Sequence, residues 1–257
     1  MYEQVRTGDT LLFSNNAPTG ALLKIFVSSE WNHSGIAVRF TINPITGQFE
    51  PTLGTEGLLF VLETNTGERY DEIQKQKIVG AGFSNSTWLF KKYNKIAVRK
   101  IKDIYRNKEL LKRTMKFAQD NIGNRFPSTT IKFIGAWLGI SFTENDPKNK
   151  EMFCSEIMAH YYSYTIGQQK VYTISADKPE NNLYQLFGTD APDLEELYTP
   201  EHYTFKKTPN SKVFAAREEV FYQNTGDLLY IIFQPFILIL LVILLIWITL
   251  PGNRILK

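Results

Sequence analysis

Cys154 is the only cysteine among 257 residues, and it lies where a thiol can act as a nucleophile. It opens the segment 154–164, CSEIMAHYYSY, which contains no Pro or Gly and carries Glu156 in its first turn. This pattern predicts a helix that begins close to Cys154. A helix N-terminus lowers the pKa of a thiol, and the thiolate is the reactive form. The alternative is that Cys154 is an inert, small core residue.

His33 and Glu63 are the side chains that would complete a catalytic set with Cys154. His33 enters the apolar segment HSGIAV, and Glu63 ends the next apolar segment, FVLE. A strand can hold an imidazole as a general base, and a neighbouring carboxylate can fix its tautomer and orientation. Taken singly, His33 is better interpreted as a hydrogen-bonded structural histidine, and Glu63 as a solvated carboxylate at the end of a strand. His160 falls on a different helix face from Cys154, which leaves His202 as a reserve base.

The composition argues against several other kinds of site. A lone cysteine forms no internal disulfide, and no two histidines have the i, i+4 spacing of a helical metal site, so we expect neither a metal nor a cofactor. Arg254 and Lys257 are the only charged residues among the last thirty, which leaves residues 1–227 with a net charge of +1. So small a charge does not predict nucleic-acid binding.

The elements needed to hold these groups follow from the apolar pattern. Apolar stretches between turn residues predict strands at 10–13, 35–40, 58–63 and 95–101. The Pro- and Gly-rich segment 43–57 predicts a hairpin-like excursion. The segment 107–121, NKELLKRTMKFAQDN, predicts a helix that ends before Gly123. Together with the helix at Cys154, these elements predict an α+β fold with an antiparallel sheet.

Residues 228–250 form an uncharged run, LLYIIFQPFILILLVILLIWITL. As a helix they would span roughly 34 Å at ~1.5 Å per residue, which is enough to cross a bilayer. The run therefore predicts one transmembrane helix, the alternative being a buried core helix. The predicted organisation is a domain over 1–200, a linker over 201–227, the span at 228–250 and a short tail at 251–257.

Several short motifs occur in an order that resembles the circularly permuted branch of the NlpC-type papain-like cysteine hydrolases. This group includes bacterial lipoproteins and poxvirus proteins, and the resemblance covers roughly residues 5–200. The residues that carry it are Gly8-Asp9-Thr10-Leu11-Leu12-Phe13, His33-Ser34-Gly35-Ile36, Val61-Leu62-Glu63-Thr64, Phe153-Cys154-Ser155-Glu156 and Ala191-Pro192-Asp193-Leu194.

The resemblance implies a papain-like fold and attack of the Cys154 thiolate on an acyl carbonyl. His33 would act as base and then acid, Glu63 as the orienting acceptor, and the backbone N–H of Cys154 as one oxyanion donor. One departure concerns residues 123–126, GNRF, where many relatives carry a Tyr-Asp pair after a Gly. This departure leaves the pocket wall and the substrate open.

Two functions from different classes are compatible with these features. The first is a membrane-anchored hydrolase or acyltransferase acting on an amide or ester, with a lipid or a membrane-bound protein as the favoured substrate because the anchor concentrates such molecules at the site. The second is a catalytically silent structural or assembly protein that uses the same fold to dock protein partners. Its 18 Phe, 13 Tyr and 4 Trp residues would supply the contact area.

The topology follows from the two ends of the sequence. Residues 1–13 contain no apolar run of the signal-peptide kind, and a free thiol suits a reducing compartment. We therefore expect a single-pass tail anchor with residues 1–227 on the cytosolic side, and the poxvirus resemblance makes a viral membrane one of the membranes it fits. The Asn-x-Ser/Thr sequences at Asn32 and Asn85 are then expected to carry no glycan.

Overall fold

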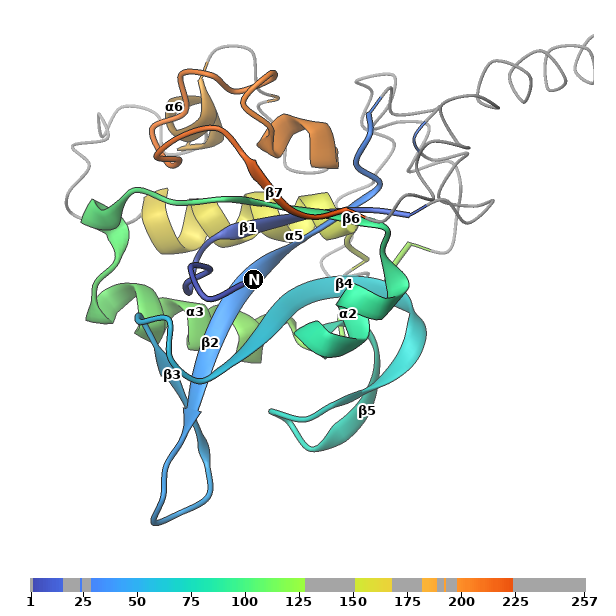
Figure 1. Cartoon of the computed structure of the whole chain (residues 1–257), viewed down its shortest axis with the longest axis vertical. Helices are drawn as coiled ribbons and strands as arrows, with labels where there is room; N and C mark the ends of the chain where they lie inside the picture. The colour runs from blue at the N-terminus through green and yellow to red at the C-terminus, as the bar shows by residue number, and fades with distance from the viewer. Residues whose placement is uncertain are drawn as a thin grey trace, which may run out of the picture.

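The structure is a computed structural model that describes residues 2–15, 24, 29–127, 151–167, 182–188, 192 and 198–223. Within these residues the chain forms one twisted sheet with helices packed on it (Figure 1), and each pair of neighbouring strands runs antiparallel. The predicted α+β class with an antiparallel sheet is therefore confirmed.

The sheet has the strand order β5-β4-β2-β1-β6-β7, and β3 pairs with β2. The predicted strands are confirmed, and the excursion at 43–57 contains the turn between β2 and β3. Two strands were not anticipated, β5 and β7. The bounds are β1 Thr10–Ser14, β2 His33–Ile42, β3 Phe49–Thr52, β4 Leu58–Asp71, β5 Gln76–Asn85, β6 Lys95–Arg99 and β7 Glu219–Gln223.

Both predicted helices are present. Asn107 caps the first, since its Oδ1 accepts a hydrogen bond from the Leu110 N–H at 3.0 Å. The second begins at Cys154 and continues into a short π-helix at Ser163–Gly167. The other helical elements are short. The bounds are α2 Ser86–Lys92, η1 Asp103–Tyr105, α3 Lys108–Asn121, α5 Cys154–Tyr162, η2 Ser163–Gly167, α6 Asn182–Phe187 and η5 Pro200–Tyr203.

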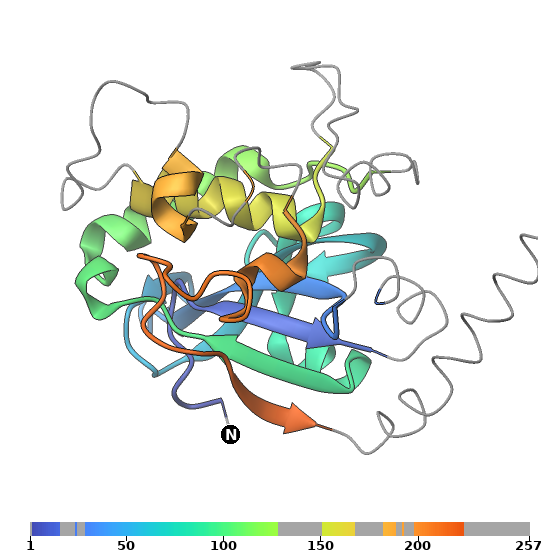
Figure 2. The same cartoon turned by 90° about the horizontal axis from the view of Figure 1, so that it is seen from above.

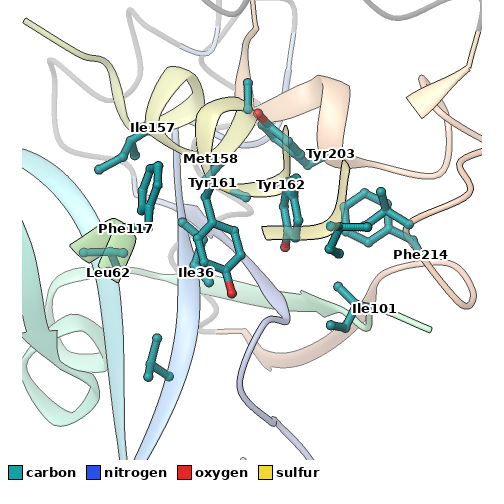
Figure 3. Packing of buried hydrophobic residues seen from close by; sticks show 14 of the residues in the cluster. Ile36, Leu62, Ile101, Phe117, Ile157, Met158, Tyr161, Tyr162, Tyr203 and Phe214 are labelled. Carbon is teal, nitrogen blue, oxygen red and sulfur yellow. The ribbon is translucent and has the colours of Figure 1, made fainter. Parts of the chain in front are cut away.

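A hydrophobic core lies on each face of the sheet because alternate residues of a strand point to opposite faces. Leu62 of β4 belongs to the larger core, which α3 and α5 cover, and Val61 belongs to a smaller core shared with α2. Figure 2 shows α3, α5 and α6 together on one side of the sheet. Figure 3 shows Met158, Tyr161 and Tyr162 of α5 together with Ile36 and Ile101, which belong to the same larger core.

The Gly8-Asp9 motif joins the start of β1 to the segment that follows β6. The buried Asp9 carboxylate accepts hydrogen bonds from the N–H of Arg6 at 2.8 Å, the N–H of Ile101 at 3.0 Å and Arg106 Nη2 at 2.5 Å. Gly8 has a φ of +93°, and a Cβ there would lie 2.7 Å from Ile101 Cδ1. The motif therefore fixes β1 in the sheet.

The segment 201–227, expected to be a linker, belongs to the fold as far as Gln223. Arg99 on β6 is buried and donates to the carbonyls of Tyr203 at 3.1 Å and Thr208 at 2.7 Å. Phe214 forms a β-bridge with Ile101, and β7 then pairs with β6. The segment folds back because its backbone carbonyls satisfy a buried guanidinium.

Within the described residues, no helix has both the length and the apolar character needed to cross a membrane. The predicted span at 228–250 and the tail at 251–257 lie outside the described residues. In the segment 191–194, which carries the last motif of the resemblance, only Pro192 is described.

Candidate active site

His33 and Glu63 meet on one face of the sheet. His33 is the first residue of β2, and Glu63 lies on the neighbouring strand β4. The imidazole Nε2 is hydrogen-bonded to Oε2 of the carboxylate, and both side chains are buried. The structure thus brings together two of the residues that the sequence analysis selected.

Gly35 makes the approach of Glu63 to His33 possible. A Cβ at this position would lie 2.5 Å from Val61 Cγ1 and 3.3 Å from Glu63 Cβ. Residues 33 and 35 point to the same face of β2, so a larger residue at 35 would push against the strand that carries the carboxylate. Steric contact with β4 therefore explains why the His-Ser-Gly motif has a glycine at position 35.

Cys154 is the first residue of α5, and its thiol contacts the His33 imidazole. Burial raises the pKa of the thiol, but the charge and hydrogen bond of His33, with the backbone N–H of Ser34, outweigh burial and lower the pKa. Because Nε2 of His33 is occupied by Glu63, Nδ1 is the ring nitrogen that remains for the thiol.

The residues after Cys154 hold the start of α5 in place. The Glu156 carboxylate accepts a hydrogen bond from the Phe153 N–H at 3.0 Å, and the Ser155 hydroxyl donates to the Tyr198 carbonyl at 2.6 Å. Tyr203 in turn donates its hydroxyl to the Ser155 carbonyl at 2.6 Å. The Cys-Ser-Glu motif therefore combines the thiol with two side chains that anchor the helix end.

The pKa values of the pair follow from these contacts. Burial lowers the pKa of His33, but the thiolate of Cys154 and the carboxylate of Glu63 outweigh it and raise the pKa to about 9. Burial raises the pKa of Glu63, but the charge and hydrogen bond of His33, followed by Arg69 and Ser84, lower it to about 2. Near neutral pH the imidazole of His33 is therefore protonated and the carboxyl of Glu63 is ionised, and the charge of His33 favours the ionised form of the Cys154 thiol.

Arg69 and Ser84 support Glu63 and were not found from the sequence. Ser84 Oγ donates to Glu63 Oε1 at 2.5 Å, and Arg69 Nε lies 3.8 Å from the same oxygen. Arg69 Nη2 donates to the Gly80 carbonyl at 2.8 Å. A register shift between Asn65 and Arg69 in the β4–β5 pairing places the guanidinium there. No motif marks this shift in the sequence.

Tyr93 and Phe13 pack against the imidazole ring of His33 and against each other, with their own centroids 4.9 Å apart. The Tyr93 ring is stacked on His33 with centroids 5.5 Å apart and planes at 1°, and the Phe13 ring lies 5.6 Å from His33. Burial raises the pKa of the Tyr93 phenol well above its ordinary value, so the hydroxyl is neutral. These contacts restrict rotation of the imidazole.

The remaining histidines do not join this cluster. His202 is on η5, where its Nδ1 accepts a hydrogen bond from the Thr199 N–H at 2.9 Å. Burial lowers the pKa of His202 to about 4, and its ring packs against Tyr198 at 5.5 Å. His160 lies in the last turn of α5. In the described part of the chain, no three His, Cys, Asp or Glu side chains are grouped as metal ligands.

Residues 123–126, GNRF, lie beside β5. The Asn124 carbonyl accepts a hydrogen bond from the Ala81 N–H at 2.8 Å, and the Gly123 N–H donates to the Ala81 carbonyl at 2.9 Å. Gly80 has a φ of +91°, and a Cβ there would lie 2.0 Å from the Asn124 carbonyl oxygen. Residues 123–124 therefore cover the outer edge of the strand that carries Ser84.

No protein-family model matches the chain, and no curated protein matches its sequence. Among solved structures, the chain is similar to one titled "Crystal structure of metalloprotein yiiX from Escherichia coli O157:H7, DUF1105". The two are 13% identical with a TM-score of 0.45, and the match covers 86% of this chain and 98% of the other. At this level of similarity, the function has to be inferred from the geometry of the site itself.

Proposed function

We propose that the chain is a thiol-dependent hydrolase or acyltransferase that acts on an amide or ester. The observation that carries this proposal is the buried His33 imidazole, which contacts the Cys154 thiol and the Glu63 carboxylate. The pKa of the thiol is lowered and that of the imidazole raised, which is what a nucleophile paired with a general base requires.

The proposed reaction begins when Sγ of Cys154 bonds to the acyl carbon and the carbonyl π electrons move to the oxygen. In this reaction the backbone N–H of Cys154, which has no intrahelical acceptor in the first turn of α5, stabilises the developing oxyanion. The intermediate then expels the amine or alcohol, which takes the proton from His33 and leaves a thioester.

The second half of the reaction restores the thiol. Water, or an acceptor alcohol or amine, donates its proton to His33 as it attacks the thioester carbon, and the thiolate of Cys154 leaves. Water as the acceptor makes the protein a hydrolase, and another nucleophile makes it an acyltransferase. Glu63 keeps the imidazole oriented throughout and does not take the proton.

The resemblance to permuted NlpC-type papain-like hydrolases supports this proposal because its motifs have separate roles around the site. Gly8-Asp9 secures β1, Gly35 admits Glu63 and Ser155-Glu156 anchor the helix that carries the nucleophile. We extend the proposal to a membrane anchor at 228–250 and a cytosolic active site, because an uncharged run of that length predicts a span. Such an anchor favours a lipid or membrane-bound protein as the substrate.

The proposal is tested by trapping the acyl intermediate. Full-length protein in detergent is incubated with 4-nitrophenyl acetate, and the peptide containing Cys154 is examined for an acetyl group by mass spectrometry. We expect acetylation of Cys154 that is absent in Cys154→Ala and strongly slowed in His33→Ala. Acetylation spread over lysines with none on Cys154 would contradict the proposal and favour the structural or assembly role.

A further inference from the structure

Lys92 lies at the edge of the catalytic cluster. It is the last residue of α2, and the next residue, Tyr93, stacks on the His33 ring. The Lys92 Nζ lies 5.4 Å from the centroid of the Tyr93 ring and 4.8 Å from that of Trp88. Trp88 and Lys92 are four residues apart and share a face of the helix. Two aromatic rings therefore hold the ammonium on the Tyr93 side of the imidazole.

The charge of Lys92 is not balanced by a carboxylate of its own. It forms no salt bridge within the described residues, and the charges that act on it are those of Glu63, Arg69 and Cys154. Glu63 and the Cys154 thiolate are already matched by the cations of His33 and Arg69. Among the cations around Glu63 in the described residues, Lys92 is therefore the one without a carboxylate partner in a salt bridge.

We propose that Lys92 binds an oxyanion of the substrate, a carboxylate or a phosphate, next to the scissile acyl group. This inference rests on the proposed function and names the substrate class for that site. The Trp88 ring is 43% exposed, so it holds the ammonium on one side and offers an apolar surface to the rest of the substrate. An acyl substrate with a nearby negative charge is then preferred over a neutral one.

The preference is measured with two alkylating reagents of nearly equal size. Iodoacetate and iodoacetamide both lose iodide to the Cys154 thiolate, but only the first carries a negative charge. The ratio of their rate constants cancels any change in the fraction of thiolate, so it reports attraction of the anion alone. We expect Lys92→Gln to lower the iodoacetate-to-iodoacetamide ratio by about threefold to tenfold, and added NaCl to reduce the ratio in the native protein.

Matched variants distinguish an effect of Lys92 at the site from an effect of the protein's net charge. Lys91 is also exposed and adjacent on α2, so Lys91→Gln makes the same change in net charge. We expect Lys91→Gln to leave the ratio nearly unchanged, Lys92→Arg to preserve it, and Trp88→Leu to lower it. An unchanged ratio in Lys92→Gln, or an equal fall in Lys91→Gln, would overturn the inference.

The same assay keeps this inference distinct from the proposed function. Iodoacetamide alone shows whether the native thiol is activated, whereas the ratio shows whether Lys92 selects anions. An ordinary thiol with a ratio that depends on Lys92 would refute the catalytic proposal and retain the anion site. An activated thiol with a ratio independent of Lys92 would retain the catalytic proposal and refute the anion site.

Competition then distinguishes the two oxyanions. Acetate and inorganic phosphate are each tested for slowing the iodoacetamide reaction of Cys154, with NaCl at equal ionic strength as the reference. Stronger protection by phosphate assigns a phosphorylated substrate, and equal or stronger protection by acetate assigns a carboxylated one. Either protection should be lost in Lys92→Gln. Protection by neither anion beyond that of NaCl would overturn the inference.

Discussion

At the scale of single residues, Glu63 determines the charge of its neighbour His33. One of its oxygens bonds to His33 and the other accepts from Ser84, so both are engaged by groups that favour the ionised form. The carboxylate in turn stabilises the imidazolium, whose charge lowers the pKa of the Cys154 thiol. Removing Glu63 should therefore lower the pKa of His33 and leave the buried Arg69 guanidinium without this carboxylate.

Glu63→Gln should lose less activity than Glu63→Ala. The amide keeps the shape and retains an oxygen that can accept from His33, whereas alanine leaves the imidazole without a partner. We expect Glu63→Ala to reduce the rate of Cys154 acetylation on the order of 10²-fold, and His33→Ala to reduce it further. Equal and negligible effects of the two changes at position 63 would show that this carboxylate is a bystander.

Arg69→Met should change the acid stability of the protein through Glu63. The pKa of Glu63 is about 2 against an ordinary 4.5, so its ionisation contributes stability that is present above pH 4.5 and lost as the pH falls towards 2. Removing the neighbouring guanidinium raises this pKa and makes the pH-dependent contribution smaller. Denaturant unfolding between pH 7 and pH 2 measures the change.

Two controls show whether Arg69 acts through Glu63. In a Glu63→Gln background, Arg69→Met should alter the pH dependence less, because the carboxyl paired with the guanidinium is gone and Asp71 is the carboxylate that still acts on it. Arg113→Met removes an exposed pair with Glu109 and should have little effect. A change of equal size with and without the Glu63 carboxyl would assign Arg69 a purely structural role.

At the scale of elements, the approach of β2 to β4 depends on Gly35. Gly35→Ala places a methyl group 2.5 Å from Val61 Cγ1 and 3.1 Å from the Leu62 carbonyl oxygen. We expect a loss of about 1–3 kcal/mol of stability, since overpacked sites relax only in part, and a larger proportional loss of acetylation because Glu63 is displaced. Thermal unfolding and the acetylation rate measure the two effects.

Gly67 supplies the matched control for this substitution. A Cβ at Gly67 would meet only Asn65 Oδ1, at 3.9 Å, so Gly67→Ala should leave both stability and acetylation close to native. If the two alanine variants behaved alike, the steric reason for a glycine at position 35 would be wrong.

The sequence predicted the strands and helices whose apolar pattern is continuous. It did not predict the strand whose glycines are required by contacts with distant residues. β1, β2, β4 and β6 bury apolar residues in regular runs, and Asn107 marks the start of α3. β5 was missed because Gly80 and Gly82 interrupt its apolar pattern. Gly80 is required by the close approach of Asn124, a contact between residues far apart in sequence.

At the scale of the whole molecule, the site draws its groups from distant parts of the chain. Cys154, His33 and Glu63 could be selected from the sequence because residue type and local motif mark them. Arg69 and Lys92 could not, because a register shift in β4 and the ring of Tyr93 determine where their charges lie. The place of Arg69 and Lys92 beside the site depends on the folded structure, and no local sequence pattern encodes it.

The proposed membrane topology makes a prediction about both glycosylation sequences. Asn32 Nδ2 donates to the Asn15 carbonyl at 3.1 Å, and Asn85 Nδ2 donates to Glu72 at 3.0 Å, so both amides are engaged in the fold. Expressed in eukaryotic cells, the protein should stay in the membrane after carbonate washing and carry no glycan at either site. Protease added outside sealed microsomes should remove residues 1–227.

A glycan on Asn32 or protection of residues 1–227 from that protease would reverse the topology. Release of the intact protein by the carbonate wash would remove the anchor from the proposal. The catalytic proposal is independent of both outcomes, because the groups that carry it lie within the described residues.

The central claim is that His33 keeps the Cys154 thiol ionised. The most direct measurement is the rate of iodoacetamide alkylation of Cys154 as a function of pH, with Cys154→Ala as the blank. We expect alkylation in the native protein to begin well below the pKa of an ordinary thiol, ~8.5, and to move to higher pH in His33→Ala. A native profile that rises only through the range of an ordinary thiol, unchanged in His33→Ala, would contradict the claim.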